Sequence, residues 1–542
     1  KMMLMDNPQD WQERMHSLQM AAAETAELML PVLDSHAVNI ASVFGVQDDP
    51  DAADNPFKVA QTRLVDQTPG AFLALAAENR PAAVPEALRE FDSRDFYQLV
   101  KETIQLIYAV DLLIALSTFA DEGFTFFMEG YYNKKNLPVS PDVPPRTIMR
   151  TLVNQVSFDL SVIQHAINQR RRQEDGQAML QGCTLAMSDT LAKWVMSVAI
   201  AAGYLPENTR VITYLAKSIR ARLVPYSHTL LISIPYSALH SGNQLSRSFL
   251  AIPHEIGHHL YWNGVHPESN LPLREHLLKQ AGEAGIKSGD WRLNWLEEIF
   301  SDAHALALFG PAVVLDFQDM LDDDMSEHFR EDTDKHPIPE IRPFIQTNIL
   351  RRFTDENGLV LYDHECKQLD NNWRSWIKKH PLKASFPLIG RSQPMLGQAI
   401  LDDLAPLITV VLDTLTDVLP TEKYYTGMEG SNELSALFTE FQNSELPDDD
   451  LELVNLFLNG YSTDEQTDAF LERSSEISFR EHVATVTHKK PVEIKTAEWI
   501  QLLRSHGWSS EGPMGDPGGT TTGTGNGGGT TTGTGDGGST NS

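Results

Sequence analysis

Cysteine is scarce in this chain of 542 residues, which contains only Cys183 and Cys366. Two cysteines far apart in the sequence exclude a disulfide framework and exclude a site that holds a metal with four thiolates. The low count is typical of a reducing compartment. Long apolar runs are also missing, because segments 106–120 and 193–205 fall short of the roughly 20 residues that a membrane span needs. We therefore expect both segments to be buried helices and expect no membrane span.

Positive charge is the second scarcity. The chain has 43 Lys and Arg residues against 74 Asp and Glu residues, a formal net charge of -31. Nucleic acids and anionic membranes bind clustered cations, so this composition argues against both as partners. The acidity is typical of a highly soluble protein. The apolar run at the start is too short for a signal peptide, so we expect a cytoplasmic protein, with any export by a signal-independent route.

Apolar patterning divides the chain into four regions. Residues 1–205 have apolar side chains at helical spacing, which predicts an N-terminal helical region. Residues 206–344 begin with short segments rich in β-branched residues, typical of strands, and continue into helices. Residues 345–510 predict a C-terminal helical region. Residues 511–542 repeat a Gly/Thr-rich unit that cannot bury a core, so we expect a disordered tail. The fold class that we predict is α+β, predominantly α-helical.

The segment "PHEIGHH", which starts at Pro253, contains a His-Glu-x-x-His spacing. On a helix, residues four apart share a face, so His254 and His258 can present their rings to one metal ion. Glu255 can reach a water on that metal without being a ligand, which suits a general base. The alternative is an ordinary packed helix, because this spacing also arises by chance. The proline directly before the motif is compatible with a helix that starts there or bends there.

A catalytic zinc needs a third protein ligand. The extended motif H-E-x-x-H-x-x-G-x-x-H does not supply it, because Tyr261 and Gly264 occupy its glycine and final histidine positions. Segment 294–306, "NWLEEIFSDAHAL", offers a carboxylate instead. Glu298 can be the third ligand. Asp302, four residues later on the same helix face, can accept a hydrogen bond from the far nitrogen of a ligating histidine.

The pair "HEIGH" and "EIFSD" resembles the two motifs of the gluzincin metallopeptidases. Segment 335–344, "KHPIPEIRPF", is similar to the H-P-x-x-x-x-R element of the HtpX and CAAX prenyl-protease group. The resemblance spans roughly residues 210–344. It implies a small zincin-type catalytic core, a short mixed sheet with an active-site helix. It also implies that the catalytic residues include His336 and Arg342, which would line the site and donate to the oxyanion of the tetrahedral intermediate. Members of that group are membrane proteins, and no span is visible here.

The resemblance implies a zinc metallopeptidase, of the metalloendopeptidase type, that holds one Zn²⁺ ion and hydrolyses a polypeptide substrate. The lack of a long apolar run predicts that it is soluble. An extended substrate would pair with a sheet edge, for which segments 220–226 and 228–235 are the candidates. A catalytically inactive metal-binding scaffold or interaction protein is the alternative. A delivered effector or toxin cargo, docking through the helical flanks or the Gly/Thr tail, is a further reading.

Four other histidines lie near these motifs in the sequence. His259 and His304 fall off the ligand faces of their helices, so we expect them to be packing or surface residues. His240 and His266 fall in predicted loops. We expect them to be ordinary loop residues, and contact with the substrate is the less favoured alternative.

Overall fold

The computed structural model describes ten parts of the chain, with gaps between them. These are residues 8–43, 93–129, 145–172, 180–224, 226–239, 247–322, 332–333, 335–354, 357–379 and 385–416. The Gly/Thr tail, His240 and the predicted helices after residue 416 lie outside the described residues. The described residues form an α+β fold that is predominantly helical, which confirms the predicted fold class.

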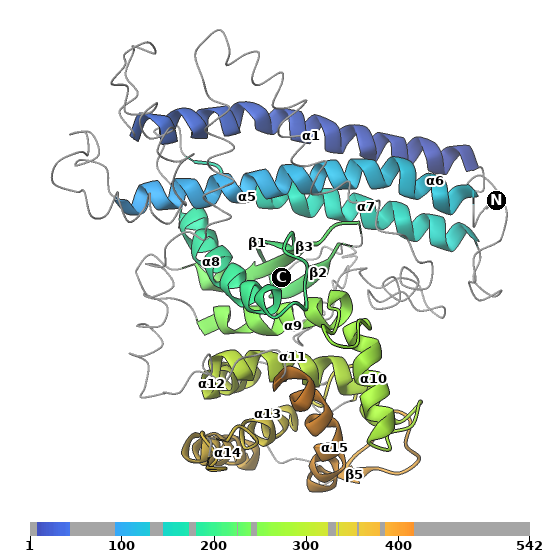
Figure 1. Ribbon diagram of the computed structural model, residues 1–542, viewed down its shortest axis with the longest axis vertical. Coiled ribbons are helices and arrows are strands. Elements are labelled where there is room, and N and C mark those ends of the chain that lie inside the picture. The colour runs from blue at the N-terminus through green and yellow to red at the C-terminus, as the bar shows by residue number, and fades with distance from the viewer. Residues whose placement is uncertain are drawn as a thin grey trace, which may run out of the picture.

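Three long helices lie on one side of a small sheet, with two of them against the sheet and the third, α1 (Pro8–Val43), packed on those two (Figure 1). They are α1, α5 (Ser93–Thr118) and α7 (Pro145–Asn168), and α5 continues through a π-helical turn (Phe119–Gly123) into α6 (Phe124–Phe127). Their apolar stripes face one another and the sheet, from which Ile212 and Leu231 join the same core. Among the described residues, one helix, Lys101–Asp121, is long and apolar enough to cross a membrane, and 78% of its most apolar window is buried inside the protein.

The sheet has three strands in the order β1-β3-β2. Strand β1 (Arg210–Ala216) runs parallel to β3 (Thr229–Pro235), and β2 (Arg220–Leu223) runs antiparallel to β3. Because β3 is central, it is buried on both faces and reads as a nearly continuous apolar run. Strand β2 is at an edge. Of the two segments expected to offer an edge, 220–226 does so, whereas 228–235 was the wrong choice because its strand has a neighbour on each side.

The opposite face of the sheet packs on a second, larger helical layer (Figure 1). Alternate residues of β3, Leu230, Ile232 and Ile234, enter its core. The helices of this layer are α8 (Leu180–Ala201), α9 (Ile252–Asn263), α10 (Leu273–Glu283), α11 (Leu296–Phe309), α12 (Pro311–Asp322), α13 (Arg342–Leu350), α14 (Asp363–Lys379) and α15 (Gly397–Thr416). Short 3-10 turns (Tyr236–Ala238, Arg247–Ala251 and Trp291–Trp295) and the pair β4 (Ser385–Phe386) and β5 (Met395–Leu396) complete it.

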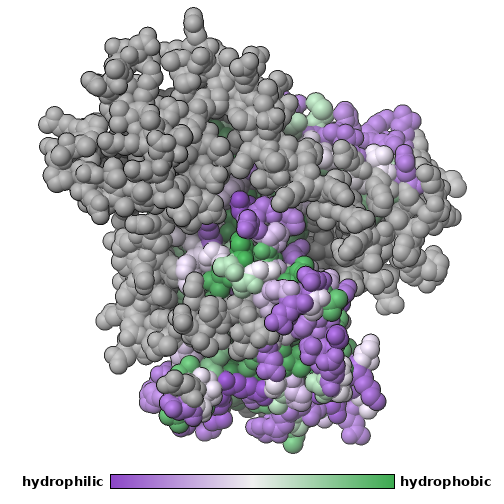
Figure 2. Space-filling view, viewed as in Figure 1, coloured by the Kyte–Doolittle hydropathy of each residue, from purple (hydrophilic) through white to green (hydrophobic). Residues whose placement is uncertain are grey.

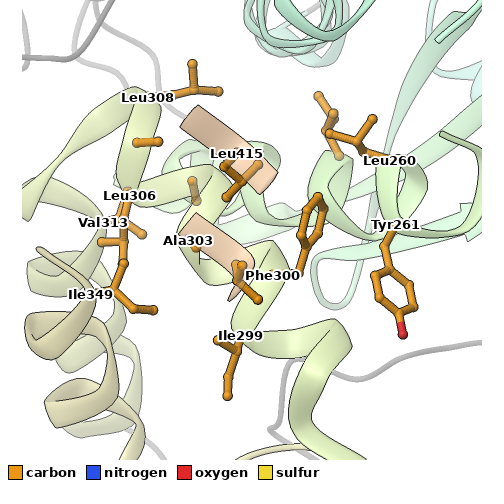
Figure 3. Packing of buried hydrophobic residues seen from close by; sticks show 14 of the residues in the cluster. Leu260, Tyr261, Ile299, Phe300, Ala303, Leu306, Leu308, Val313, Ile349 and Leu415 are labelled. Atoms are coloured by element: carbon orange, nitrogen blue, oxygen red, sulfur yellow. The ribbon is translucent and has the colours of Figure 1, made fainter. Parts of the chain in front are cut away.

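Helices α9 and α11 lie at the centre of this second core. Figure 3 shows Phe300 of α11 between Leu260 and Tyr261 of α9 on one side and Leu415 of α15 on the other. Because the core continues from α8 to α15, the described C-terminal helices pack on the same core as the two helices that carry the sequence motifs. On the face drawn in Figure 2, the described surface at the lower end is largely hydrophilic, with small hydrophobic patches between.

Candidate metal centre

Helix α9 begins at Ile252, so Pro253 lies in its first turn. The N–H groups of a first turn have no partner within the helix, and a proline there removes no hydrogen bond. The carbonyl oxygen of Pro253 lies 2.9 Å from Nδ1 of His304 on α11, which joins the two helices at this point. The proline therefore starts the motif helix and does not bend it.

Gly257, between the two motif histidines, allows α9 to approach α11 closely. A Cβ atom at this position would lie 2.7 Å from the Cα atom of Ser301, closer than real side chains come to a backbone atom. The glycine is therefore required by the contact between two helices. This close contact brings the histidine face of α9 within reach of the acidic residues of α11.

His254 and His258 point their Nε2 atoms at each other across 3.1 Å. Their Nδ1 atoms face carboxylates: that of His254 lies 3.0 Å from Asp302 Oδ1, and that of His258 lies 2.8 Å from Glu297 Oε1. The contact of His258 Nδ1 with Glu297 has hydrogen-bond geometry, and a carboxylate can only accept, so this Nδ1 carries a proton. His254 Nδ1 is close to Asp302 but forms no hydrogen bond with it. The two Nε2 atoms face one space, and an oxygen of Glu298 joins them, with all three ligand atoms within 4.8 Å of one another.

This geometry fits a bound cation. Two Nε2 lone pairs that face each other repel unless a proton or a cation lies between them. Two nitrogens bound tetrahedrally to zinc at 2.0–2.1 Å are about 3.3 Å apart, close to the separation seen here. Two histidines and one glutamate are also a ligand set that zinc accepts. Among the described residues, no other group of histidine, cysteine and acidic side chains converges in this way.

The charges of the site also suit a divalent ion. Burial disfavours a charged His254, but Asp302 and Glu298 outweigh it and raise the pKa of this histidine to about 9. The pKa of His258 is raised in the same way, because Glu298 and Glu297 outweigh burial. The pKa of Glu298 lies well below its usual range, since His336 and Arg342 overcome its burial. The acidic residues thus stabilise positive charge at the two histidines. A bound metal ion can supply this charge, and protons on the rings supply it without one.

Arg342, at the start of α13, binds the acidic residues of α11. Its guanidinium donates to both carboxylate oxygens of Asp302 at 2.8 Å and lies 2.8 Å from Glu298 Oε2. Its Nη2 atom is also 3.3 Å from His254 Nε2. His336 approaches the same cluster, with Nε2 3.2 Å from Glu298 Oε1. Both residues of the third sequence element therefore lie at the centre. Arg342 contacts the predicted third ligand, Glu298, and the predicted supporting carboxylate, Asp302.

Glu255 is fully buried beside the two histidines. Its Oε2 atom accepts a hydrogen bond from the backbone N–H of Ala221 in the edge strand β2. No described residue donates to its Oε1 atom. Burial raises the pKa of this carboxyl group, and the neighbouring His258 and His254 reduce that effect without cancelling it. One oxygen is therefore anchored and the other is available.

Sequence reasoning missed Glu297. This residue accepts hydrogen bonds from Trp262 Nε1 and from His258 Nδ1, each at 2.8 Å, so it orients the second histidine. The available sequence signal was the pair of adjacent acidic residues, Glu297 and Glu298. The residue directly before a metal ligand on one helix can also contact a ligand on the neighbouring helix. The contact of Ala221 with the proposed base had no signal in the sequence.

The remaining histidines are outside the ligand group. His259 is buried, and burial together with His228 lowers its pKa to about 3. Its ring contacts Asn263 on the same helix. His266 stacks on His276 with ring centroids 3.8 Å apart. None of these residues belongs to the ligand group.

Comparison with known proteins does not assign the chain to a family. No family model, no curated protein and no solved structure matches it. Its function must be inferred from the site itself.

Proposed function

We propose that this protein is a zinc-dependent metallopeptidase of the gluzincin type, in which His254, His258 and Glu298 hold one zinc ion. The observation that supports this most strongly is the convergence of two Nε2 atoms, 3.1 Å apart, with an oxygen of Glu298. A carboxylate lies within 3.0 Å of the opposite nitrogen of each ring, and Glu297 holds that of His258 by a hydrogen bond. Three protein ligands are typical of a catalytic zinc, because a fourth position stays open. A bound zinc would polarise the substrate carbonyl and lower the pKa of a water molecule.

Glu255 is the general base in this proposal. Its free Oε1 atom takes a proton from the attacking water and delivers it to the leaving amine. Its raised pKa suits both halves of this task, because a carboxyl group with a raised pKa is a stronger base for the water proton and can still return that proton. The N–H of Ala221 fixes the plane of the carboxylate, so that the free oxygen keeps its direction during the reaction.

Arg342 and His336 take different roles. Arg342 is 3% exposed, and its contacts with Asp302 and Glu298 make it a positioning residue that keeps both carboxylates charged. The side chain of His336 is 16% exposed and is the more accessible of the two. Burial lowers the pKa of His336, and an imidazole ring has at least one N–H to donate in either protonation state. It is therefore our candidate donor to the negative oxygen that develops during hydrolysis.

A second candidate function is a metal-binding scaffold without activity. The burial of the site favours it, since His254, Glu255, His258 and Glu298 are each at most 5% exposed. The free oxygen of Glu255 favours the peptidase, because a structural zinc has no use for an unpartnered carboxylate next to a ligand. The peptidase proposal also includes a polypeptide substrate and a cytoplasmic location. A role as a delivered effector is a further part of it.

The test uses the purified full chain and a pooled fluorogenic peptide library. We expect one zinc per chain and hydrolysis that a chelator stops. Glu255→Gln should keep its zinc and lose at least about a hundredfold in rate, which is the lower end of what general bases contribute. His254→Ala should lose both zinc and activity. Glu283→Gln, on the exposed side of α10, is the control and should match the wild type.

Each outcome separates the two functions. Full activity in Glu255→Gln contradicts the assignment of the base. Unchanged zinc content in His254→Ala contradicts the metal site. One tightly bound zinc without hydrolysis of any peptide in the library supports the scaffold and rejects the peptidase.

A further inference from the structure

Asp332 connects three segments of the chain close to the metal centre. Its Oδ1 atom accepts a hydrogen bond from Trp295 Nε1 at 3.2 Å, and its Oδ2 atom accepts one from the backbone N–H of Ile389 at 2.7 Å. Trp295 is fully buried and directly precedes α11, the helix that carries Glu298. Ile389 follows β4. One carboxylate therefore ties residue 332 both to the start of the metal-centre helix and to the segment after β4.

His336 follows four positions later, between two residues that are held in place. Before it, Asp332 is held by the two hydrogen bonds just described. After it, Ile338 is fully buried in the second core, and its carbonyl oxygen accepts from the backbone N–H groups of Ile341 and Arg342. Anchors on both sides reduce the conformations open to the backbone between them. The backbone of His336 therefore has a defined place beside α11.

Thr333 contacts His336 twice. Its Oγ1 atom accepts a hydrogen bond from the backbone N–H of His336 at 3.4 Å, and the same oxygen lies 3.4 Å from Nδ1 of the ring. A hydroxyl can accept one hydrogen bond and donate another. On the other side of the ring, Nε2 lies 3.2 Å from Glu298 Oε1, and a carboxylate oxygen can only accept. The neutral ring therefore accepts from the hydroxyl at Nδ1 and carries its own hydrogen on Nε2.

The hydrogen on Nε2 faces the metal centre. Although this atom lies close to Glu298, it forms no hydrogen bond with any described residue. Its N–H is thus available to a group that enters the site. In the proposed hydrolysis that group is the substrate carbonyl oxygen, which becomes negative as the water attacks. The direction of one ring therefore decides whether the donor meets this oxygen.

We propose that Asp332 and Thr333 are positioning residues for His336. Asp332 fixes the backbone that carries the histidine, and Thr333 sets the tautomer and the direction of its ring. Both residues precede the third sequence element. The catalytic consequence rests on the proposed function, whereas the placement of the ring does not require a substrate. A donor to the developing oxyanion acts in the transition state, so loss of either positioning residue should lower kcat and leave KM unchanged.

The first measurement is steady-state hydrolysis by the zinc-loaded full chain. Thr333→Val keeps the shape of an exposed side chain and removes its hydroxyl, so kcat should fall about fivefold, the contribution of one hydrogen bond. Thr333→Ser keeps the hydroxyl and should retain the wild-type kcat. Asp332→Ala should lower kcat about ten- to a hundredfold, because displacement of a catalytic group costs up to that much. Asp402→Ala, at an exposed position of α15, is the control and should change nothing.

The second measurement needs no substrate and does not depend on peptidase activity. Diethyl pyrocarbonate acylates histidine ring nitrogens, and mass spectrometry of the peptide that contains His336 gives the rate at this ring. The wild type should react slowly, because the side chain is held and is only 16% exposed. Asp332→Ala and Thr333→Val should each react several-fold faster, with the zinc content of the wild type. Thr333→Ser and Asp402→Ala should react at the wild-type rate.

The outcomes separate the positioning role from the proposed function. Unchanged acylation of His336 in both Asp332→Ala and Thr333→Val would overturn the proposal whatever the activity. Thr333→Ser with the defect of Thr333→Val, or a change in KM alone, would also overturn it. A wild type that binds zinc and hydrolyses no peptide rejects the peptidase, and the acylation rates then decide the positioning by themselves.

Circular dichroism confirms that each variant is folded. If Asp332→Ala is unfolded, Asp332→Asn takes its place, because the amide keeps one acceptor oxygen and loses the other. Its acylation rate should rise and its kcat should fall in the same direction, by less than a complete loss of the side chain would cause. A wild-type rate of acylation in Asp332→Asn and in Thr333→Val would contradict the proposal.

Discussion

The backbone N–H of Ala221 donates a hydrogen bond to Glu255 Oε2, which ties the proposed general base to the edge strand of the sheet. The next residue along the strand, Arg222, forms a buried ion pair with Asp159 of α7. Asp159 also accepts hydrogen bonds from Gln155 and Tyr226. Helix α7 therefore anchors strand β2, which in turn anchors Glu255. The N-terminal helices thus support the metal centre without contacting it.

The first prediction concerns the ion pair of Arg222 and Asp159. Replacing Arg222 by methionine leaves a carboxylate that is 0% exposed without its cation, and should reduce the free energy of unfolding by about 3–5 kcal/mol. The exposed pair of Arg391 and Asp403 is the matched control, because Arg391→Met should change stability by less than about 1 kcal/mol. Urea denaturation measures both. Equal effects of the two substitutions would show that the buried pair is not an anchor.

The second prediction concerns Gly257. Gly257→Ala places a methyl group against the backbone of Ser301, and should reduce the free energy of unfolding by about 1–3 kcal/mol while weakening zinc binding as α9 and α11 separate. Gly282 is the control, because a Cβ atom there meets nothing within 4 Å. Gly282→Ala in α10 should be neutral or stabilising by up to about 1 kcal/mol. A neutral Gly257→Ala would contradict the close contact.

The third prediction concerns Glu297. Glu297→Leu removes the acceptor from His258 Nδ1, so its ring loses its fixed orientation and zinc affinity should fall about 10–100-fold. Glu297→Gln keeps a neutral oxygen acceptor and should lose less. Competition with a chromophoric chelator measures both affinities. If the two variants bind zinc as tightly as the wild type, Glu297 does not orient the ligand.

The fourth prediction concerns pH. The pKa of His254 is about 9 without metal, so this histidine is protonated at neutral pH and must release its proton to bind zinc. Zinc affinity should therefore rise with pH, about tenfold per unit for each proton released, and level off near pH 9. The raised pKa of His258 makes the lower part of the curve steeper. Zinc affinity that is constant between pH 6 and 8 would show that the histidines are not protonated in the free protein.

The local part of the site could be predicted from the sequence, because a helix repeats on a fixed period. The spacing of His254 with His258, and of Glu298 with Asp302, places each pair on one helix face whatever surrounds it. The role of Glu297 was missed because it depends on the rotation of α11 against α9. The sequence could not decide which of two segments, 220–226 or 228–235, forms the edge strand, because strand order depends on pairing between distant residues.

The sequence by itself determined the predominantly helical fold class and the residue types that can bind a metal. These follow from composition and from contacts within a few residues along the chain. Only the tertiary structure decided that α9 and α11 meet at Gly257, that Arg342 binds Asp302 and Glu298, and that Ala221 anchors Glu255. Each of these contacts joins residues at least 34 positions apart, where the packing of whole elements sets the geometry.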